Sequence, residues 1–526
     1  MSRLTKHFPY KNIRPAQEEA INFAIDEFEK GKKYVIIEAG TGVGKSAIAW
    51  TISNYFDFKT YFITTQKILQ DQYVRDFGKD GGIKSIKSAT NYYCHHHKAP
   101  QTCAEGLRAL KASTNQKYRQ EVNKSCRYKQ LKRQFIANPR GVTNFPYFLA
   151  ETFYSGQLEP RELLVIDEAH NIESELSKFV EISFSSKFAK NVLKVNFPEK
   201  FTNAKIIKWV KEVYYPKAKS QLEHMERMLE KYTSIKNKLK EFTNVMKQYE
   251  ILDKHVCKIT RFLEAYNSEN WVLNIIENGG NYKAEFKPVD ISSFTEKYLF
   301  RNGEKVLMMS ATILNKDGFC ESLGLSKEEV SFISLPSPFP KSNRPIMYFP
   351  IGSMSFKNIN NSLPKLADAV REIINQHKNE KGIIHCHSYN IVKYLKENLK
   401  DKRILTHDST NRDRVLWRHE NGKQPTVLLS PSMSEGVDLK GDKARFQILC
   451  KVPYPYLGDK LVKKRMNKWK WWYPLQTAKT VVQSVGRSVR SMEDHAVTYI
   501  LDSDWERFYN RNDHMFPKDF KKCLKR

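Results

Sequence analysis

Short apolar runs alternate with amphipathic stretches through most of the chain, which is typical of parallel sheets covered by helices. Several runs are β-branched and end in glycine, serine or an acidic residue. We expect strands at 35–37, 61–65, 163–166, 306–309, 427–429, 446–450 and 497–501. We also expect a strand with its exit loop at 382–388, a strand-to-helix pattern at 140–149, an amphipathic helix at 20–28, and helices at 66–77 and 480–491. The last strand is expected to close its sheet. A linker rich in Pro and Ser at 335–340 separates two α/β blocks of similar pattern.

Two stretches interrupt this pattern. The first is rich in Lys, Arg, Tyr and His and carries three cysteines. The second shows no predicted strand, and its apolar residues from Leu222 to Tyr249 recur at three- and four-residue steps, which predicts one long helix or a helical hairpin. The predicted domains are a first α/β block at 1–80, 141–180 and 296–334, a cysteine-containing insertion at 81–140, a helical insertion at 181–295, and a second α/β block at 335–526.

The first predicted strand leads into a glycine-rich loop, Ala39-Gly40-Thr41-Gly42-Val43-Gly44-Lys45-Ser46. A strand, such a loop and a helix predict a phosphate-binding loop, because glycine lets backbone N–H groups turn inward and the helix N-terminus favours anions. Lys45 would reach the β- and γ-phosphates, and the Ser46 hydroxyl would bind Mg²⁺. Ala39 replaces the usual first glycine, at a position that tolerates a small side chain. The simpler alternative is a glycine turn beside a solvated lysine.

The strand at 163–166 ends in Asp167-Glu168-Ala169-His170. A carboxylate at the tip of a parallel strand beside a phosphate loop suits Mg²⁺, so Asp167 is the expected ligand. Glu168 is the candidate to orient or deprotonate the attacking water. Upstream of the loop, Arg14 and Gln17 could hydrogen-bond the edge of an adenine. The chain is therefore predicted to bind a nucleoside triphosphate with Mg²⁺.

Near the end of the chain, Arg487 and Arg490 have the spacing that places two guanidiniums on one face of a helix. Their permanent charge and forked donors suit a γ-phosphate. For this pair alone, ordinary salt bridges on a surface helix are the simpler alternative.

Composition points to a polyanionic partner. The formal net charge is +30 and the pI about 9.5, which favours nucleic acid first and an anionic membrane second, with a solvated lysine-rich surface as the alternative. The first residues lack the apolar core of a signal peptide, and no uncharged run reaches the roughly 18 residues of a membrane span. Eight cysteines in 526 residues suggest reduced thiols in a cytosol-like compartment.

Taken in order, EAGTGVGKS, TT…Q, DEAH, SAT, SEGVDL and QSVGRSVR resemble the motifs of superfamily 2 helicases. RPAQ, TNFPYFL, SPFPKSNR and KVPYP resemble the XPD/DinG-like family within that superfamily. The resemblance implies an α/β protein with two RecA-like parallel-sheet motor domains that clamp ATP and Mg²⁺, a cysteine-containing insertion and a helical arch insertion. Single-stranded DNA would run across both motor domains.

The resemblance also implies roles for individual residues. Lys45, Ser46 and Asp167 would bind ATP and Mg²⁺, and Glu168 would be the catalytic base. The second motor domain would complete the site with Gln483, Arg487 and Arg490, and with Glu435, Gly436 and Asp438 near them. Coupling residues would be His170, Ser310, Ala311 and Thr312. Thr64, Thr65, Gln72 and Ser388 would lie along the nucleic acid.

The family implies a [4Fe–4S] cluster held by four cysteines of the first insertion. This chain has Cys94, Cys103 and Cys126, and no cysteine soon after Cys103. Only His95, His96 or His97 could supply a fourth ligand nearby. Three interpretations stay open: a cluster with an unusual ligand, a zinc site, or free thiols.

The predicted function is an ATP-dependent DNA helicase that moves on single-stranded DNA, in the 5′→3′ direction by resemblance, and unwinds forked or tailed duplexes. The alternatives are an RNA helicase, which the insertions and TNFPYFL disfavour, and a catalytically silent nucleic-acid clamp, which the retained site residues disfavour. We expect a monomer without a membrane partner, in the cytoplasm or at a nucleoid, with a nuclear location left open. No residue identifies the pathway, such as DNA repair or replication, or a protein partner.

Overall fold

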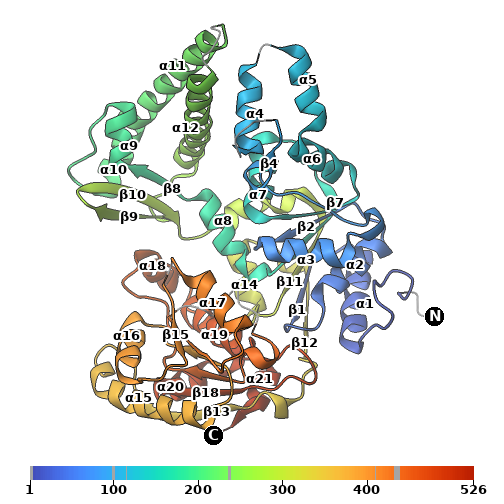
Figure 1. Cartoon of the computed structure of the whole chain (residues 1–526), viewed down its shortest axis with the longest axis vertical. Helices are drawn as coiled ribbons and strands as arrows, with labels where there is room; N and C mark the ends of the chain where they lie inside the picture. The colour runs from blue at the N-terminus through green and yellow to red at the C-terminus, as the bar shows by residue number, and fades with distance from the viewer. Residues whose placement is uncertain are drawn as a thin grey trace.

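The computed structural model describes residues 4–96, 101–113, 115–234, 239–408, 410–431 and 439–525, and within them it places two seven-stranded parallel sheets (Figure 1). The first sheet has the order β12-β1-β11-β7-β2-β6-β3. Its strands are β1 (Tyr34–Ala39), β2 (Thr60–Thr64), β3 (Lys84–Ser85), β6 (Arg140–Asn144), β7 (Arg161–Asp167), β11 (Gly303–Ser310) and β12 (Val330–Leu335). We call this sheet with its helices lobe 1.

The second sheet has the order β15-β16-β14-β17-β18-β13-β19 and forms lobe 2. Its strands are β13 (Ile346–Gly352), β14 (Gly382–His385), β15 (Ile404–Thr406), β16 (Val427–Ser430), β17 (Phe446–Leu449), β18 (Val497–Asp502) and β19 (Leu524–Lys525). Two parallel sheets confirm the predicted fold class. The expectation that the strand at 497–501 closes its sheet is wrong, because β13 pairs with its outer side and β19 follows.

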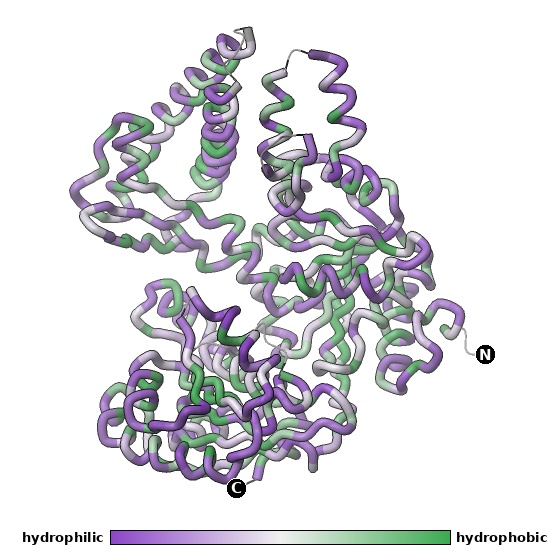
Figure 2. Tube along the Cα trace, in the orientation of Figure 1, coloured by the Kyte–Doolittle hydropathy of each residue, from purple (hydrophilic) through white to green (hydrophobic). Residues whose placement is uncertain are grey.

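Both faces of the first sheet are buried, which explains its continuous apolar runs. On β1, Val35 and Ile37 join one hydrophobic core, whereas Tyr34 and Ile36 join the core on the opposite face. Figure 2 shows the same concentration of apolar residues in the strands. The helices of lobe 1 are α1 (Pro15–Glu29), α2 (Lys45–Tyr55), α3 (Lys67–Phe77), α7 (Phe145–Ala150), α8 (Ile172–Val180), α13 (Ser292–Tyr298) and α14 (Lys316–Leu323).

Lobe 2 contains α15 (Ile359–Gln376), α16 (Tyr389–Asn398), α17 (Arg412–Asn421), α18 (Lys460–Lys468), α19 (Trp472–Val485), α20 (Asp504–Asn512) and α21 (Lys518–Cys523). The helix predicted at 480–491 is α19, which begins at Trp472 and ends at Val485. Arg487 and Arg490 therefore lie in the loop after α19, and their placement on one helical face is wrong. The Asp494 carboxylate accepts the backbone N–H groups of Arg490 and Ser491, both at 3.0 Å, in place of helical bonds.

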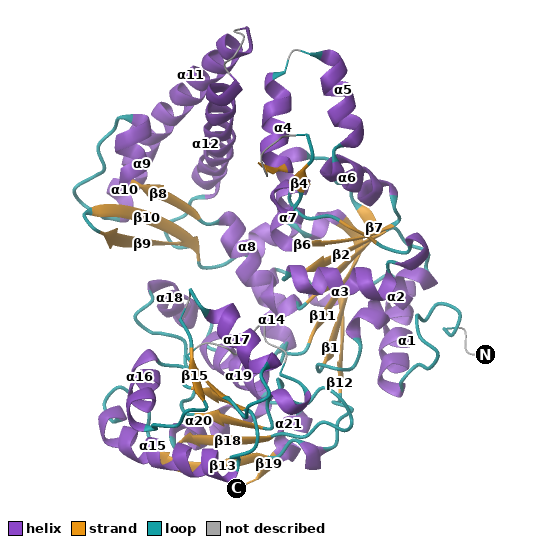
Figure 3. Ribbon diagram, in the orientation of Figure 1, coloured by secondary structure: helices purple, strands orange, loops and turns teal. Residues whose placement is uncertain are grey.

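The cysteine-containing insertion forms β4 (Tyr93–Cys94), β5 (Gln101–Thr102), α4 (Cys103–Ala112), α5 (Gln116–Ser125) and α6 (Arg127–Ala137). The second insertion, which we call the arch, contains β8 (Ile182–Ser185), α10 (Asn203–Trp209), α11 (Tyr215–Ser234), α12 (Leu239–Ala265), β9 (Trp271–Asn278) and β10 (Asn281–Pro288). The two insertions stand side by side above lobe 1 (Figure 3). Glu250 of α12 joins them through Arg108 and Lys111 of α4, at 2.8 and 3.0 Å.

One expectation for the arch needs correction. The stretch is not free of strands, since β8, β10 and β9 form an antiparallel sheet whose last turn contains Gly279 and Gly280 at positive φ. Of the two forms left open for the helical stretch, the structure shows the hairpin, in which α11 and α12 pack against each other. A hairpin repeats the period of a single helix, so the pattern did not separate the two. No helix in the described parts of the chain is long and apolar enough to cross a membrane.

Candidate functional site: a cleft between the two lobes

The glycine-rich loop turns from β1 into α2, which begins at Lys45. Gly42 and Gly44 adopt left-handed φ values of 83° and 89°, which residues with a Cβ rarely adopt. The Lys45 ammonium donates to the Ala39 carbonyl at 3.3 Å, so it lies back across the loop. This is the predicted phosphate loop, with its glycines at the two positions that require them.

Arg14 and Gln17 brace this loop from α1. Arg14 Nη1 donates to the Gly42 carbonyl and Gln17 Nε2 to the Val43 carbonyl, each at 2.9 Å. Because Arg14 and Gln17 bond the carbonyl groups of the loop, its backbone N–H groups can point to the other side, toward a ligand. The predicted contact with an adenine edge stays a prediction, whereas the bracing contact was not expected from the sequence.

Asp167 is the last residue of β7, and Glu168 follows it. Burial raises the pKa of Asp167 to about 6, and the neighbouring Glu168 adds to that rise while Lys45 opposes it. Tyr73 donates to Asp167 Oδ2 at 3.3 Å. Burial disfavours the charged form of Glu168 as well, but the cations Lys45, Arg487 and Arg490 act against it and its pKa is lowered. A buried carboxylate at the end of a parallel strand is an oxygen donor of the kind that Mg²⁺ prefers.

A chain of hydrogen bonds crosses from lobe 1 to lobe 2 through His170. Its Nδ1 lies 2.8 Å from Ser310 Oγ and its Nε2 lies 3.0 Å from Gln483 Nε2. Gln483 also donates to Thr312 Oγ1 at 3.1 Å. Burial lowers the pKa of His170 to about 4, so the ring is neutral and can accept the Gln483 proton. The structure thus joins the DEAH, SAT and QSVGR segments in one network, with Ala311 at the same cleft.

The cleft between the lobes has a volume of about 500 Å³. Its lobe 1 wall includes Gly40, Thr41, Thr65, Gln72, Glu168, His170, Ala311 and Thr312, and its lobe 2 wall includes Gln483, Gly486, Arg487 and Arg490. Thr41 Oγ1 donates to the Gly486 carbonyl at 3.3 Å. The two arginines therefore face the cleft beside the phosphate loop, although they lie on a loop and not on a helix.

The remaining predicted site residues lie elsewhere. Thr64 is buried at the end of β2, and its hydroxyl donates to the Gln66 carbonyl at 3.2 Å. Ser388 directly precedes α16 in lobe 2. Glu435, Gly436 and Asp438 lie outside the described residues, so their predicted place near the cleft stays a prediction.

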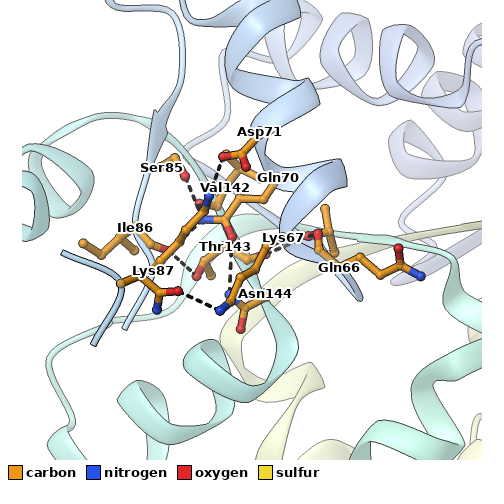
Figure 4. A network of polar contacts seen from close by, with 12 residues as sticks. Gln66, Lys67, Gln70, Asp71, Ser85, Ile86, Lys87, Val142, Thr143 and Asn144 are labelled. Atoms are coloured by element: carbon orange, nitrogen blue, oxygen red, sulfur yellow. Dashed lines mark hydrogen bonds and ion pairs between the residues drawn. The ribbon is translucent and has the colours of Figure 1, made fainter. Parts of the chain in front are cut away.

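A polar network between α3 and the strands β3 and β6 was missed from the sequence (Figure 4). Gln70 of α3 is fully buried and donates to Ser85 Oγ at 2.7 Å and to the Ile86 carbonyl at 2.8 Å. Asn144, the asparagine of TNFPYFL, donates to Gln70 Oε1 at 3.3 Å. Thr143 Oγ1 donates to the same Ile86 carbonyl at 2.8 Å. The network fixes the TNFPYFL segment against α3, which explains polar residues at the end of an apolar strand.

Glu38 was also missed, because it lies inside an apolar strand. It is buried, lines the cleft, and accepts hydrogen bonds from the Leu314 N–H at 2.6 Å and Ser334 Oγ at 2.8 Å. A charged residue in a run such as YVIIEA is the signal that could have identified it.

The cysteine-containing insertion gathers Cys103 and Cys126, both buried, with Cys94 half-buried. Burial raises the pKa of the Cys103 thiol to about 11, and the neighbouring Cys126 and Cys94 add to the rise. His96 Nε2 pairs with Ser125 Oγ at 2.9 Å, and His97 lies outside the described residues. Among the residues placed here, no three His, Cys, Asp or Glu side chains are arranged to hold a metal ion. The predicted cluster and the zinc site therefore stay predictions, beside the third interpretation of free thiols.

Comparisons with known proteins agree with the geometry. Two sequence families match, "Type III restriction enzyme, res subunit" over residues 10–207 and "Helicase C-terminal domain" over residues 370–523. The ATP-dependent DNA helicase YoaA of Escherichia coli K12 is 22% identical over 95% of this chain and 93% of its own length. The ATP-dependent DNA helicase XPD of Sulfolobus acidocaldarius is 21% identical over 74% of this chain and 73% of its own. A solved XPD helicase structure shares the fold, with a TM-score of 0.67, 15% identity and 98% of each chain covered.

Proposed function

We propose that the chain is a member of the XPD/DinG-like family of superfamily 2 helicases and acts as an ATP-dependent DNA helicase. The observation that carries the proposal is the cleft itself, in which Arg487 and Arg490 of lobe 2 face Glu168 and the phosphate loop of lobe 1. The direction of the Glu168 pKa agrees with this geometry, because Lys45, Arg487 and Arg490 lower it against the effect of burial. Cations from both lobes thus converge on one point, as a clamp on a triphosphate requires.

The chain's own residues have these roles in the cycle. The N–H groups of the glycine-rich loop and Lys45 bind the β- and γ-phosphates. Ser46 and Asp167 would hold Mg²⁺, which would supply positive charge to the phosphate oxygens. Glu168, kept ionised, orients the attacking water and accepts its proton. Arg487 and Arg490 stabilise the transferring phosphoryl group from the other side.

Coupling follows from the bridge through Gln483. Its side chain is held by His170 and Thr312 of lobe 1 while its helix belongs to lobe 2. When the cleft closes or opens, lobe 2 therefore moves relative to lobe 1. If both lobes bind the DNA and release it in turn, the protein moves along the strand in steps. Phosphate contacts dominate this kind of movement, so we expect it to depend on salt but little on DNA sequence.

The finer proposal is a monomer that loads on single-stranded DNA, moves 5′→3′ and opens forked or tailed duplexes, in the cytoplasm where it meets the chromosome. The test of the helicase assignment is the rate of ATP hydrolysis, measured with single-stranded DNA, with RNA and without nucleic acid. We expect stimulation by DNA. Stimulation by RNA alone would assign an RNA helicase, and DNA binding without any hydrolysis would assign a silent clamp.

Polarity is tested separately, with duplexes that carry a 5′ or a 3′ single-stranded tail. We expect strand displacement from the 5′-tailed duplex. Displacement from the 3′-tailed duplex alone would reverse the proposed direction without affecting the assignment as a helicase.

A further inference from the structure

Helix α18 belongs to lobe 2 but lies against the base of the arch (Figure 1). Its sequence, KLVKKRMNK, contains five basic residues and no acidic one. Three of its lysines reach the arch base: Lys460 donates to the Leu273 carbonyl at 3.4 Å, Lys464 to the Ser268 and Glu269 carbonyls at 3.2 Å each, and Lys468 pairs with Asp290 at 2.5 Å. Most of the basic face is therefore engaged within the protein.

Arg465 lies at the centre of this contact and is buried. Its Nη1 is 2.6 Å from Glu173 Oε1 of α8, its Nε donates to the Val289 carbonyl at 2.9 Å, and its Nη2 donates to the Pro288 carbonyl at 3.3 Å. The guanidinium also lies 5.6 Å from the ring centre of Trp472. A buried guanidinium that is paired and bonded to two carbonyls fixes one geometry, because separating it from them would leave polar groups unsatisfied.

The contact continues onto lobe 1 through Trp471. Its indole N–H donates to Glu321 Oε2 of α14 at 2.9 Å. The ring packs on Gly318 so closely that a Cβ there would lie 2.8 Å from it. Helix α14 follows the Ser310–Thr312 turn, so this contact lies on the same connection that bears the coupling residues.

Helix α19 joins this contact to the cleft. It starts at Trp472, next to Trp471, and carries Gln483 in its last turn. Twelve residues of α-helix separate Trp471 from Gln483, which is about 18 Å. One end of the helix is thus held by the arch base and α14, and the other end meets His170 and Thr312 across the nucleotide cleft.

We propose that residues 460–471 form an anchor about which lobe 2 turns, with Arg465 as its central positioning residue. Closure of the cleft swings α19 about this fixed end, so that ATP turnover moves DNA-binding surfaces of lobe 2 relative to the arch. The inference rests on the proposed helicase function and adds a residue set that transmits its motion. The competing view is that basic α18 is an open DNA-binding surface.

The first test measures whether the anchor stays closed. Lys464→Cys and Glu269→Cys, both at exposed positions, are combined with Cys257→Ser, which removes an exposed native thiol. A short bis-maleimide then links them in the full-length chain. We expect equal cross-linking with and without ATP, Mg²⁺ and single-stranded DNA, and linked protein that keeps ATPase and unwinding within about twofold of the unlinked protein. Cross-linking that falls when ATP is added, or linked protein that loses turnover, would overturn the proposal.

The second test loosens the anchor. Lys468→Glu places a carboxylate against Asp290, and Lys463→Glu makes the same charge change at an exposed position of the same helix. We expect Lys468→Glu and Arg465→Met to keep DNA-stimulated ATPase and DNA affinity within about threefold while unwinding falls about tenfold, and Lys463→Glu to behave as wild type. Equal impairment by both lysine variants, or loss of DNA affinity with Lys468→Glu, would support the open DNA surface instead.

The two tests also separate this inference from the proposed function. If the wild-type chain unwinds nothing, the helicase assignment fails. The cross-linking yields with and without ATP still decide whether the anchor persists, because they require no unwinding.

Discussion

Replacing Gly42 by alanine should separate the lobes at the phosphate loop. A Cβ at this position would lie 2.5 Å from the Phe339 ring and 2.9 Å from the Arg490 carbonyl. Ordinary contacts of carbon atoms are about 3.5 Å, so lobe 2 would have to move by about 1 Å. The carbonyl that moves belongs to one of the two arginines at the cleft. A displacement of about 1 Å of catalytic groups reduces turnover by about a hundredfold.

Gly31→Ala is the matched control. Gly31 has a φ of 88°, close to the 83° of Gly42, but a Cβ there would have no neighbour within 4 Å. In both variants an alanine must adopt a left-handed φ, which destabilises the folded state by about 1 kcal/mol. Both should therefore lower the temperature midpoint of unfolding by a few degrees. Only Gly42→Ala should lose DNA-stimulated ATPase, measured as kcat at saturating ATP. Wild-type kcat in Gly42→Ala, or an equal loss in Gly31→Ala, would refute the argument that the two lobes close on this glycine.

Four further predictions follow from the site and its surroundings. Lys45→Ala and Glu168→Gln should abolish ATP hydrolysis while binding of single-stranded DNA, measured by anisotropy, persists; hydrolysis at the wild-type rate would remove these roles. Gln483→Ala should lower DNA-stimulated kcat about tenfold and leave ATP affinity unchanged, because only the bridge to lobe 1 is lost; an unchanged kcat would contradict the bridge. Burial lowers the pKa of His419 to about 4, below its unfolded value. The contribution of His419 to the free energy of unfolding, which is full above pH 6.5, should therefore fall by about 2 kcal/mol by pH 5. His419→Gln should reduce this fall, measured by chemical unfolding at the two pH values. The Cys103 thiol, with its raised pKa, should stay unreactive to thiol reagents until the chain unfolds. Anaerobically purified protein should contain neither iron with acid-labile sulfide nor zinc. Stoichiometric metal would instead assign a cluster or zinc site.

The sequence predicted the elements that are buried on both faces and missed those that are not. Strands such as β1, β7 and β11 consist of uninterrupted apolar residues, and they were recognised for that reason. Strand β13 is half exposed and contains Pro350, so it lacked both the continuous run and a regular alternation. The arch strands were missed because β9 shows no regular alternation of buried and exposed residues, and β10 alternates only in its second half.

The site shows the same division. The phosphate loop, DEAH and SAT segments are local patterns whose geometry follows from a strand tip and the turn after it, and the structure brings them to one cleft. Arg487 and Arg490 lie beyond the end of α19, where the Asp494 carboxylate accepts the N–H groups of Arg490 and Ser491. This local contact replaces helical bonds, and a helical period does not reveal it. The burial of Arg465 depends on carbonyls of the arch, far away in the sequence.

The central claim is that one triphosphate is gripped by both lobes. The most direct measurement is DNA-stimulated ATP hydrolysis by the double variant Arg487→Ala/Arg490→Ala, with ATP affinity measured in parallel. Arg371→Ala, at an exposed ion pair with Asp368 on α15, is the control. The account predicts a loss of kcat of at least about a thousandfold with ATP still bound, as for other arginines that stabilise phosphoryl transfer. A double variant that hydrolyses ATP at the wild-type rate would contradict it.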